Sequence, residues 1–240
     1  MDSKCKYYCY KKTRPSIKYK NNKIKNVKLV LFDMDGVLAD TISSWKYVHD
    51  YFGTNNDNSV DEYLKGNIDD LEFIKRDVSL WLKKNCIIEK FFLSNILSKI
   101  KIMNGAEKCI NFLIENNIKT AIVSAGIDIL AERIKNQLNI DYFFANGIKT
   151  DSNGLITNEG ILQVKLMYKD ENVISLSKKL NIPFDNIVSI GNSCLDIPMF
   201  NYCGLSIAFN PDDICTKKAA DYIIEKKDLS EVIPIVSKYI

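Results

Sequence analysis

The spacing of hydrophobic positions changes along this 240-residue chain. Residues 27–32, VKLVLF, form a short apolar run that predicts a buried strand. From about Ser43 to Lys101, apolar side chains recur with the period of about 3.6 residues that amphipathic helices have, and no strand is predicted. The helical segments of this stretch are 43–53, 69–85 and 88–100, and 53–59 is predicted to be a loop.

After Asn104–Gly105, helical and extended patterns alternate. The predicted helices cover 106–117, 128–139, 170–181, 195–203, 211–219 and 229–239. The predicted strands cover 119–124, 142–146, 186–191, 204–209 and 221–225, and 148–157 reads as a hairpin that turns at Asn153–Gly154. Strands separated by helices predict an α/β fold, a doubly wound, Rossmann-like parallel sheet with helices on both faces.

These patterns divide the chain into three parts. Residues 1–26 form a basic N-terminal extension, and residues 42–101 form a small α-helical cap inserted after the first strand. The α/β core then consists of 27–41 and 102–240. In such sheets the active site lies outside the carboxyl ends of the strands, so the polar residues there indicate the chemistry.

The net charge of +3 conceals an uneven distribution. Residues 1–28 contain ten Lys or Arg and one Asp, which leaves 23 basic and 29 acidic residues in the remainder. The extension has no apolar periodicity, which favours a solvated arm. The alternative is an electrostatic contact with nucleic acid, an acidic partner or a membrane surface. Tyrosines interleave with its lysines, but nothing specifies a base-reading surface, so a nucleic-acid partner is not favoured.

The remaining composition narrows the class of protein. Seven scattered cysteines favour small buried side chains in a reducing compartment, and a single histidine, His49, argues against a zinc site of ordinary ligand count. His49 shares an apparent helix face with Trp45 and Phe52, which favours a packing role over a catalytic one. No apolar run approaches the roughly 18 residues of a membrane span. We expect a cytoplasmic, soluble protein.

Polar side chains follow several of the predicted strands. Asp33 and Asp35 follow the first strand, and Ser124 ends the next. A later helix opens with Lys169, and the following strand runs into Asn192, Ser193 and Asp196. A doubly wound sheet can bring these positions to one crevice.

This set of groups suits phosphoryl transfer from a monoester. Asp33 would attack phosphorus and form an aspartyl-phosphate, while Asp35 would protonate the leaving alkoxide and then activate water. Ser124 and the backbone amide of Ala125 would bind phosphate oxygens, and Lys169 would offset the repulsion between carboxylate and phosphate.

Oxygen ligands for Mg²⁺ are also present. Asp33, the backbone carbonyl of Asp35, Asn192 and Asp196 are the candidates, because Mg²⁺ prefers oxygen and needs few protein ligands. The predicted substrate is a small-molecule phosphate ester. Lys165 is a rival to Lys169, but the position at a helix start favours Lys169.

The motifs DMDGVL, VSAG, the helix-opening lysine and GNSCLD resemble those of haloacid dehalogenase-like hydrolases, in order and spacing. From about residue 28 to 240 the chain is similar to the phosphoserine phosphatase-like branch of that superfamily. The resemblance implies a Rossmann-like core, a helical cap, Mg²⁺ and an aspartyl-phosphate. It assigns Asp33 as nucleophile and Asp35 as acid and base. Ser124 and Lys169 match its phosphate binders, and Asn192 and Asp196 its metal motif.

The chain departs from the family pattern in several places. Asn192 stands where Asp is usual, which predicts weaker Mg²⁺ binding, and Leu195 replaces a common Asn. Ile42 occupies the position of a cap Glu that grips the amino group of phosphoserine. Arg76, one residue out of register, is the candidate for gripping a substrate carboxylate. A substrate other than phosphoserine is therefore as consistent with the sequence.

Two alternatives to a phosphatase remain open. The same motifs serve a phosphotransferase or mutase that passes the phosphoryl group to an alcohol. Asn192 and the basic extension also suit a catalytically weak regulatory protein that binds phosphate ligands. Trp45 and Trp81 in the cap favour packing over substrate stacking.

Overall fold

The structure is a computed structural model that describes residues 23–240. Most of the predicted basic extension, residues 1–22, lies outside the described residues.

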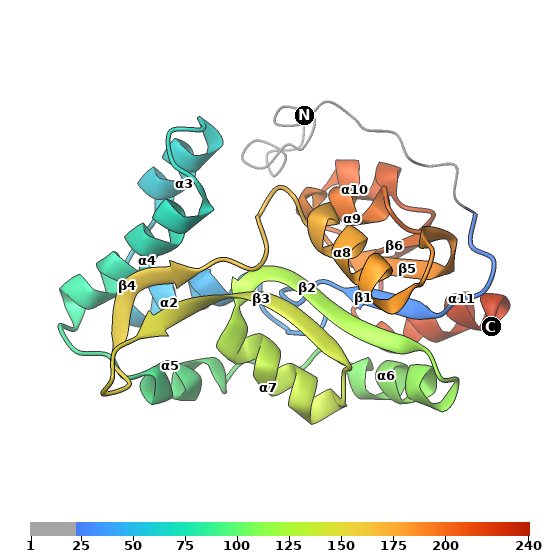
Figure 1. The fold of residues 1–240 in the computed structure, drawn as a ribbon, viewed down its shortest axis with the longest axis horizontal. Helices are drawn as coiled ribbons and strands as arrows, with labels where there is room; N and C mark the ends of the chain where they lie inside the picture. The colour runs from blue at the N-terminus through green and yellow to red at the C-terminus, as the bar shows by residue number, and fades with distance from the viewer. Residues whose placement is uncertain (1–22) are drawn as a thin grey trace.

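The described chain forms a seven-stranded sheet in the order β4-β3-β2-β1-β5-β6-β7, with helices on both faces (Figure 1). Neighbouring strands are parallel except β3 and β4, which are antiparallel. The strands are β1 (Leu29–Phe32), β2 (Lys119–Ile127), β3 (Tyr142–Thr150), β4 (Ile156–Ile161), β5 (Ile187–Gly191), β6 (Leu205–Phe209) and β7 (Tyr222–Ile224). The predicted doubly wound α/β fold is confirmed.

Strand β1 lies at the centre because all four of its residues are apolar and buried. Successive side chains of a strand point to opposite faces of the sheet. Val30 and Phe32 pack into one core with α6 (Ala106–Glu115), α7 (Asp128–Leu138) and α11 (Ile233–Val236). Leu29 and Leu31 pack into a second core with α8 (Asp170–Leu180) and α9 (Ile197–Phe200). A short helix, α10 (Ile214–Ala219), precedes β7.

Four helices lie between β1 and α6 in the chain, and we call them the insert helices (Figure 1). They are α2 (Ser44–Phe52), α3 (Asp57–Leu64), α4 (Asp70–Lys84) and α5 (Lys90–Leu97). The predicted loop 53–59 is too long, because α3 already begins at Asp57, where the side chain of Asn55 accepts from the Asp57 amide at 2.7 Å. This helix is short and mostly polar, so its period does not stand out.

The β3–β4 hairpin binds the insert helices to the sheet. The Lys90 amide donates to the Gly154 carbonyl at 3.0 Å, and the Ile156 amide donates to the Ile88 carbonyl at 2.9 Å. A Cβ atom on Gly160 of β4 would lie 2.7 Å from the Ile74 side chain of α4, so glycine permits this close approach. The hairpin therefore fixes α4 beside the edge of the sheet.

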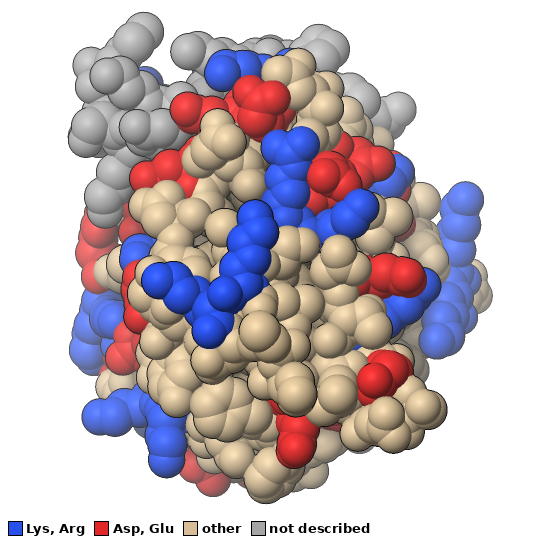
Figure 2. Space-filling model, turned by 90° about the vertical axis from the view of Figure 1, so that its left-hand side faces the viewer, with Lys and Arg blue, Asp and Glu red and all other residues tan. Residues whose placement is uncertain are grey.

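The surface around the insert helices carries charges of both signs. Figure 2 shows Lys and Arg interspersed with Asp and Glu on this face. The Lys149–Glu159 pair, at 2.6 Å, and the Lys75–Glu72 pair, at 3.7 Å, are exposed. Polyanion binding uses a field of one sign, and this face does not present one. Separately, none of the helices in residues 23–240 combines the length and apolarity that a bilayer crossing requires.

Candidate active site

The candidate active site is a cavity of about 430 Å³ at the carboxyl ends of β1, β2 and β5, bounded on the other side by α2, α3 and α4. Asp33, Asp35, Ser124, Ala125, Lys169 and Asn192 all line it. The sequence-predicted groups at the strand ends thus meet in one place, as the parallel sheet requires.

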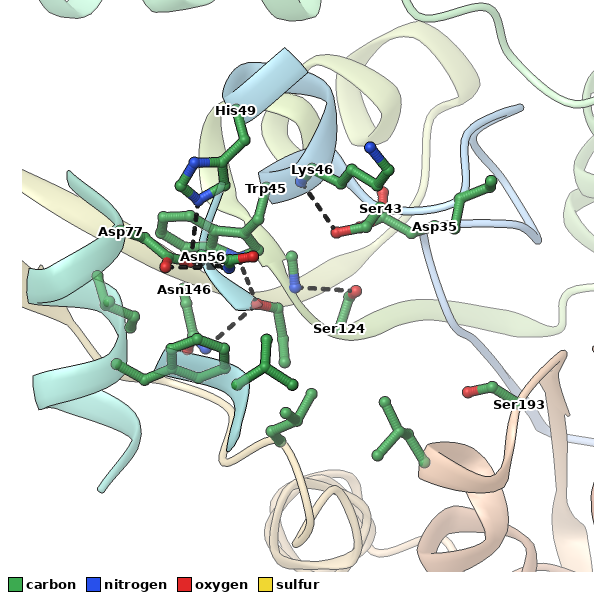
Figure 3. Close-up of a pocket in the computed structure, with 18 of the residues that line it drawn as sticks. Asp35, Ser43, Trp45, Lys46, His49, Asn56, Asp77, Ser124, Asn146 and Ser193 are labelled. Carbon is green, nitrogen blue, oxygen red and sulfur yellow. Dashed lines mark hydrogen bonds and ion pairs between the residues drawn. The ribbon is translucent and has the colours of Figure 1, made fainter. Parts of the chain in front are cut away.

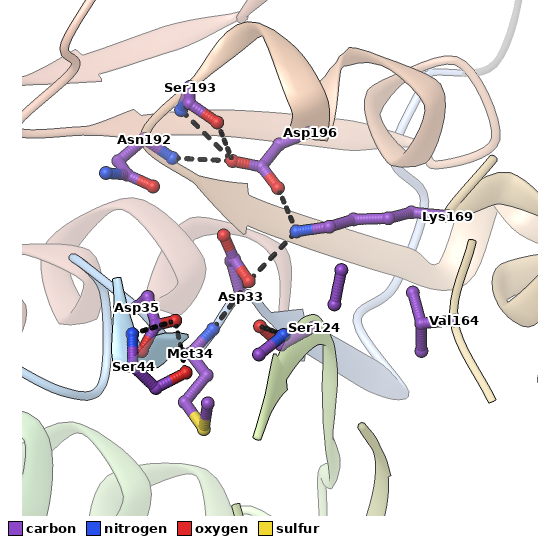
Figure 4. A network of polar contacts seen from close by, with 12 residues as sticks. Asp33, Met34, Asp35, Ser44, Ser124, Val164, Lys169, Asn192, Ser193 and Asp196 are labelled. Atoms are coloured by element: carbon purple, nitrogen blue, oxygen red, sulfur yellow. Dashed lines mark hydrogen bonds and ion pairs between the residues drawn. The ribbon is translucent and has the colours of Figure 1, made fainter. Parts of the chain in front are cut away.

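Asp33 is the first residue after β1 and is 6% exposed. The buried strand holds its backbone, since the Asp33 amide donates to the Ile190 carbonyl of β5 at 2.9 Å. Oδ1 accepts from the Met34 amide at 2.7 Å and lies 2.9 Å from Lys169 Nζ (Figure 4). Both of these contacts involve Oδ1 of the Asp33 carboxylate, and neither involves Oδ2.

Lys169 precedes α8 and is only 2% exposed. Its Nζ lies between Asp33 and Asp196, 2.7 Å from Asp196 Oδ1. Burial lowers the pKa of Lys169, but the two carboxylates more than offset it, and the net pKa is raised. The rival Lys165 is about half exposed and pairs with Glu171 at 3.0 Å. Lys169 therefore supplies a fixed buried positive charge beside Asp33, and Lys165 does not.

Asp196 lies in the short 3₁₀ helix Cys194–Asp196 after β5 and is fully buried. Oδ2 accepts from the amides of Asn192 and Ser193 at 2.9 and 3.0 Å, and Oδ1 accepts from Lys169. Burial and Asp33 raise the pKa of Asp196, while Lys169 opposes them. Both oxygens are thus engaged by the protein, so Asp196 holds Lys169 and the loop after β5 in position.

Asp35 faces the N-terminus of α2. Its Oδ2 accepts from the amide and the hydroxyl of Ser44, both at 2.8 Å, and Oδ1 is buried without a hydrogen-bond partner among the described residues. Burial raises the pKa of Asp35, and the Ser44 hydrogen bonds oppose that rise only in part. A carboxyl group that readily holds a proton suits acid and base chemistry.

Ser124 and Ala125 lie on β2, which runs to Ile127 and is longer than predicted. The following helix begins where the sequence predicts it, at Asp128, and only the end of the strand differs. The Ile127 amide donates to the Ser44 hydroxyl at 3.0 Å, which holds the end of β2 extended, and α7 begins at Asp128. Ser124 Oγ accepts from the Gly126 amide at 3.2 Å. The Ser124 hydroxyl and Ala125 still line the cavity, but on an extended segment.

Asn192 stands where a metal ligand is expected. Its Nδ2 donates to Asp212 Oδ2 at 3.1 Å, and Figure 4 shows its amide oxygen on the side toward Asp33. Gly36, at φ +80°, has no Cβ, and a Cβ there would lie 2.3 Å from Asn192 Nδ2. Within residues 23–240 no three His, Cys, Asp or Glu side chains are grouped to hold a metal.

The oxygen donors nevertheless fit a hard cation. Asp33 and Asn192 offer carboxylate and amide oxygens, and Gly36 lets the loop after β1 approach the Asn192 side chain closely. Mg²⁺ commonly uses one or two carboxylates and takes its other oxygens from water and substrate phosphate. Compared with the family pattern the set has one carboxylate fewer, although Asp212 also lines the cavity.

Arg76 is not among the residues that line the cavity. Its Nε donates to Glu72 at 3.0 Å on the exposed side of α4. The cavity instead receives side chains that the sequence did not single out for function, among them His49, Asn56, Asp70 and Asp77 of the insert and Asp212 after β6. The four-residue spacing of Trp45 and His49 placed both on one helix face, but it did not show that this face borders a cavity.

Comparison with known proteins identifies the family. The sequence profile of the haloacid dehalogenase-like hydrolases matches residues 27–204. The phosphoserine phosphatase of Methanocaldococcus jannaschii is 31% identical over 88% of this chain and 99% of its own. That of Campylobacter jejuni subsp. doylei is 30% identical over 88% of this chain and all of its own.

Solved structures agree with these relatives. A phospho-aspartyl intermediate analogue of phosphoserine phosphatase is 29% identical, with a TM-score of 0.73 over 88% of this chain and 100% of its own. A substrate-bound phosphoserine phosphatase is 28% identical, with a TM-score of 0.74 over 88% of this chain and 99% of its own. The chain therefore belongs to the haloacid dehalogenase-like hydrolases, in their phosphoserine phosphatase-like branch, and is a phosphoric monoester hydrolase.

Proposed function

We propose that the chain is a Mg²⁺-dependent phosphatase that hydrolyses a small-molecule phosphate monoester through an aspartyl-phosphate at Asp33. The observation that carries this proposal is the contact of Asp33 Oδ1 with the buried Lys169, at 2.9 Å, where both residues line the cavity. A bound analogue of the phospho-aspartyl intermediate in a similar phosphoserine phosphatase supports the same route.

In the first step, an oxygen of Asp33 forms a bond to phosphorus while the bond between phosphorus and the ester oxygen breaks. Asp35 gives its proton to the departing alkoxide. In the second step, water gives a proton to Asp35 and its oxygen bonds to phosphorus, while the bond to Asp33 breaks and phosphate leaves. The buried position of Asp35, which raises its pKa, suits both proton transfers.

Lys169 lowers the electrostatic barrier to the approach of Asp33 to a phosphate dianion. Its pairing with Asp196 holds the ammonium in place before substrate arrives. The Ser124 hydroxyl and the Ala125 amide would bind phosphate oxygens. Asp33, the Asp35 carbonyl and Asn192 would hold Mg²⁺, which when bound neutralises phosphate charge.

The insert helices would act as a cap, residues 42–101, over a core made of 27–41 and 102–240. The indole Nε1 of Trp45 donates to the Ala125 carbonyl at 3.0 Å, which joins the cap directly to the phosphate end of the cavity. Closure of such a cap would exclude water from the first step.

The test is hydrolysis of p-nitrophenyl phosphate with Mg²⁺ and with EDTA. We expect Mg²⁺-dependent turnover, and we expect Asp33→Asn to abolish it while Asp40→Asn, an exposed acid outside the cavity, leaves it unchanged. Product analysis with an added acceptor alcohol separates hydrolysis from phosphotransfer. Tight phosphate binding without turnover in any divalent cation would instead support a regulatory protein and contradict the proposal.

A further inference from the structure

The cap end of the cavity contains a second polar cluster, away from Asp33. His49 on α2 and Asp77 on α4 are 3% and 4% exposed, and both line the cavity together with Asn56 (Figure 3). Asn56 Nδ2 donates to both oxygens of Asp77, at 3.0 and 3.1 Å. The proposed reaction uses none of these groups.

The protonation of His49 follows from its neighbour Trp81. The indole Nε1 of Trp81 donates to His49 Nδ1 at 3.0 Å, and an indole N–H can only donate. Nδ1 must therefore accept, and the proton of the imidazole resides on Nε2. Thr54 Oγ1 lies 2.7 Å from the same Nδ1, and its hydroxyl donates to the His49 carbonyl at 3.4 Å. The ring is thereby held with an N–H at Nε2.

That N–H has no hydrogen-bond partner among the described residues, although Nε2 is buried. The nearest acidic oxygen, Asp77 Oδ2, lies 3.4 Å away without hydrogen-bond geometry. A buried donor left unpaired is costly, and such a donor beside a cavity is accounted for when a ligand completes it. The cluster thus offers a donor and an acceptor side by side.

Only some ligand groups can bind both the donor, His49 Nε2, and the acceptor, Asp77. A hydroxyl accepts from His49 Nε2 and donates to Asp77 at once. A carboxylate would accept from His49 but would be repelled by the negative charge of Asp77. An ammonium would pair with Asp77, but it has no acceptor for the His49 N–H. The pair therefore selects a neutral hydroxyl.

The charged residues around this end of the cavity also favour a neutral group on the ligand. Of the described residues that line the cavity, the cap supplies one cation, Lys46, which is 59% exposed and pairs with Asp50. Asp57 and Asp70 line the same region, so a carboxylate on the substrate would be repelled by their negative charges. Of the described cap residues that line the cavity, only the exposed Lys46 could offer a positive charge to the carboxylate of phosphoserine, and it already pairs with Asp50.

The distance along α2 sets the size of the ligand. Ser44, which binds Asp35, and His49 are five residues apart on one helix, a rise of roughly 7–8 Å. A substrate whose ester oxygen lies at Asp35 must extend over several carbon atoms to reach His49.

From this geometry we infer that the cavity takes a polyol or sugar monophosphate, with one of its hydroxyls bridging His49 Nε2 and Asp77. The inference rests on the proposed phosphatase function and names its substrate class. It makes His49 and Asp77 specificity-determining residues for the leaving group.

The experiment compares kcat/KM for ribose 5-phosphate, glucose 6-phosphate and sorbitol 6-phosphate with kcat/KM for O-phosphoserine and p-nitrophenyl phosphate. We expect at least one polyol or sugar phosphate to exceed phosphoserine. The kcat/KM for that substrate, divided by kcat/KM for p-nitrophenyl phosphate, should fall about 10- to 100-fold in Asp77→Asn and in His49→Asn. A loss of this size corresponds to one hydrogen bond to a charged or buried partner. Glu72→Gln, on the exposed side of α4, should keep the wild-type ratio.

The two His49 variants separate binding from packing. Asparagine places an oxygen near the position of Nδ1, so it still accepts from Trp81, but it has no N–H in place of Nε2. Glutamine places an amide N–H near Nε2, so His49→Gln should recover part of the ratio. Equal losses on all substrates in His49→Asn, or a preference for phosphoserine in the wild type, would overturn the inference.

A binding measurement keeps the two hypotheses distinct. Calorimetry of Asp33→Asn with the same sugar phosphates should show affinity that His49→Asn lowers. If p-nitrophenyl phosphate is not hydrolysed but this discrimination remains, the proposed reaction fails and the ligand class stands. If the aryl ester is hydrolysed and no sugar phosphate binds or reacts better than phosphoserine, the ligand class fails and the reaction stands.

Discussion

Replacement of Lys169 by methionine tests whether this buried ammonium is the charge that stabilises the site. The side chain keeps its length and apolar stem, but Asp33 and Asp196 lose the cation that lies 2.9 and 2.7 Å from them. Removal of one partner from a buried ion pair costs about 3–5 kcal/mol, because it leaves uncompensated charge in the interior. With a urea m-value of about 2 kcal/mol/M, the unfolding midpoint should fall by roughly 2 M.

The matched control is Lys165→Met, four residues earlier. Lys165 pairs with Glu171 at 3.0 Å on the surface, and an exposed pair contributes about 0–1 kcal/mol. Both variants are unfolded in urea at pH 7 with EDTA, so that no metal contributes. The same midpoint for Lys169→Met and Lys165→Met would refute the argument from buried charge.

The pH dependence gives a second check on Lys169→Met. Burial and Asp33 raise the pKa of Asp196, and the ammonium of Lys169 opposes that rise. Without the ammonium the pKa rises further above its unfolded value, so the folded state binds more protons than the unfolded state. The stability of the variant relative to wild type should therefore recover as pH falls from 7 toward 5. A deficit that is constant over this range would contradict the electrostatic cause.

Other residues give shorter tests. Asn192→Asp restores a carboxylate beside Asp33, so it should tighten Mg²⁺ binding about tenfold in calorimetry; unchanged or weaker affinity would show that Asp212 already supplies the charge or that the ion binds elsewhere. Asp35→Asn should leave a burst of nitrophenolate from p-nitrophenyl phosphate and slow steady turnover about 100-fold or more, because the aryl group leaves without a proton while water still needs a base; loss of the burst would move Asp35 into the first step. Asp128 has one buried carboxylate oxygen without a partner among the described residues, and burial raises its pKa. The charged form is thus disfavoured in the fold, so Asp128→Asn should gain stability relative to wild type as pH rises from 4 to 7, and urea midpoints that run parallel over this range would contradict that.

The sequence predicted the sheet because its signals are local. The run at 27–32 is apolar throughout, as a strand buried on both faces must be, and the alternation after Gly105 sets the order of strands and helices. Asp33 and Ser124 could be assigned to one site because the carboxyl ends of parallel strands meet at one edge of the sheet. Lys169, which precedes a helix, was assigned from its place among the family motifs.

The chain's own spacing did not show the partners of these groups. Nothing near Asp196 in the sequence indicates that both of its oxygens are taken by Lys169 and by backbone amides. The extension of β2 to Ile127 depends on the Ser44 hydroxyl, which is 83 residues away in the chain. Such contacts arise only when the insert folds over the sheet.

The insert helices were the least predictable part for the same reason. His49 and Trp81 are 32 residues apart, and their hydrogen bond depends on how α2 and α4 pack. A helical period shows which face of α2 is apolar, but it does not show whether that face meets a core or a cavity.

The most direct test of the central claim is chemical trapping of Asp33 during turnover. The enzyme is mixed with p-nitrophenyl phosphate and Mg²⁺, quenched, treated with borohydride, which reduces an acyl phosphate to an alcohol, and digested for mass spectrometry. We predict a reduced side chain at position 33, present only when substrate is added and absent from Asp33→Asn. Turnover at full rate with position 33 unmodified, or with the modification at another carboxylate, would contradict the account.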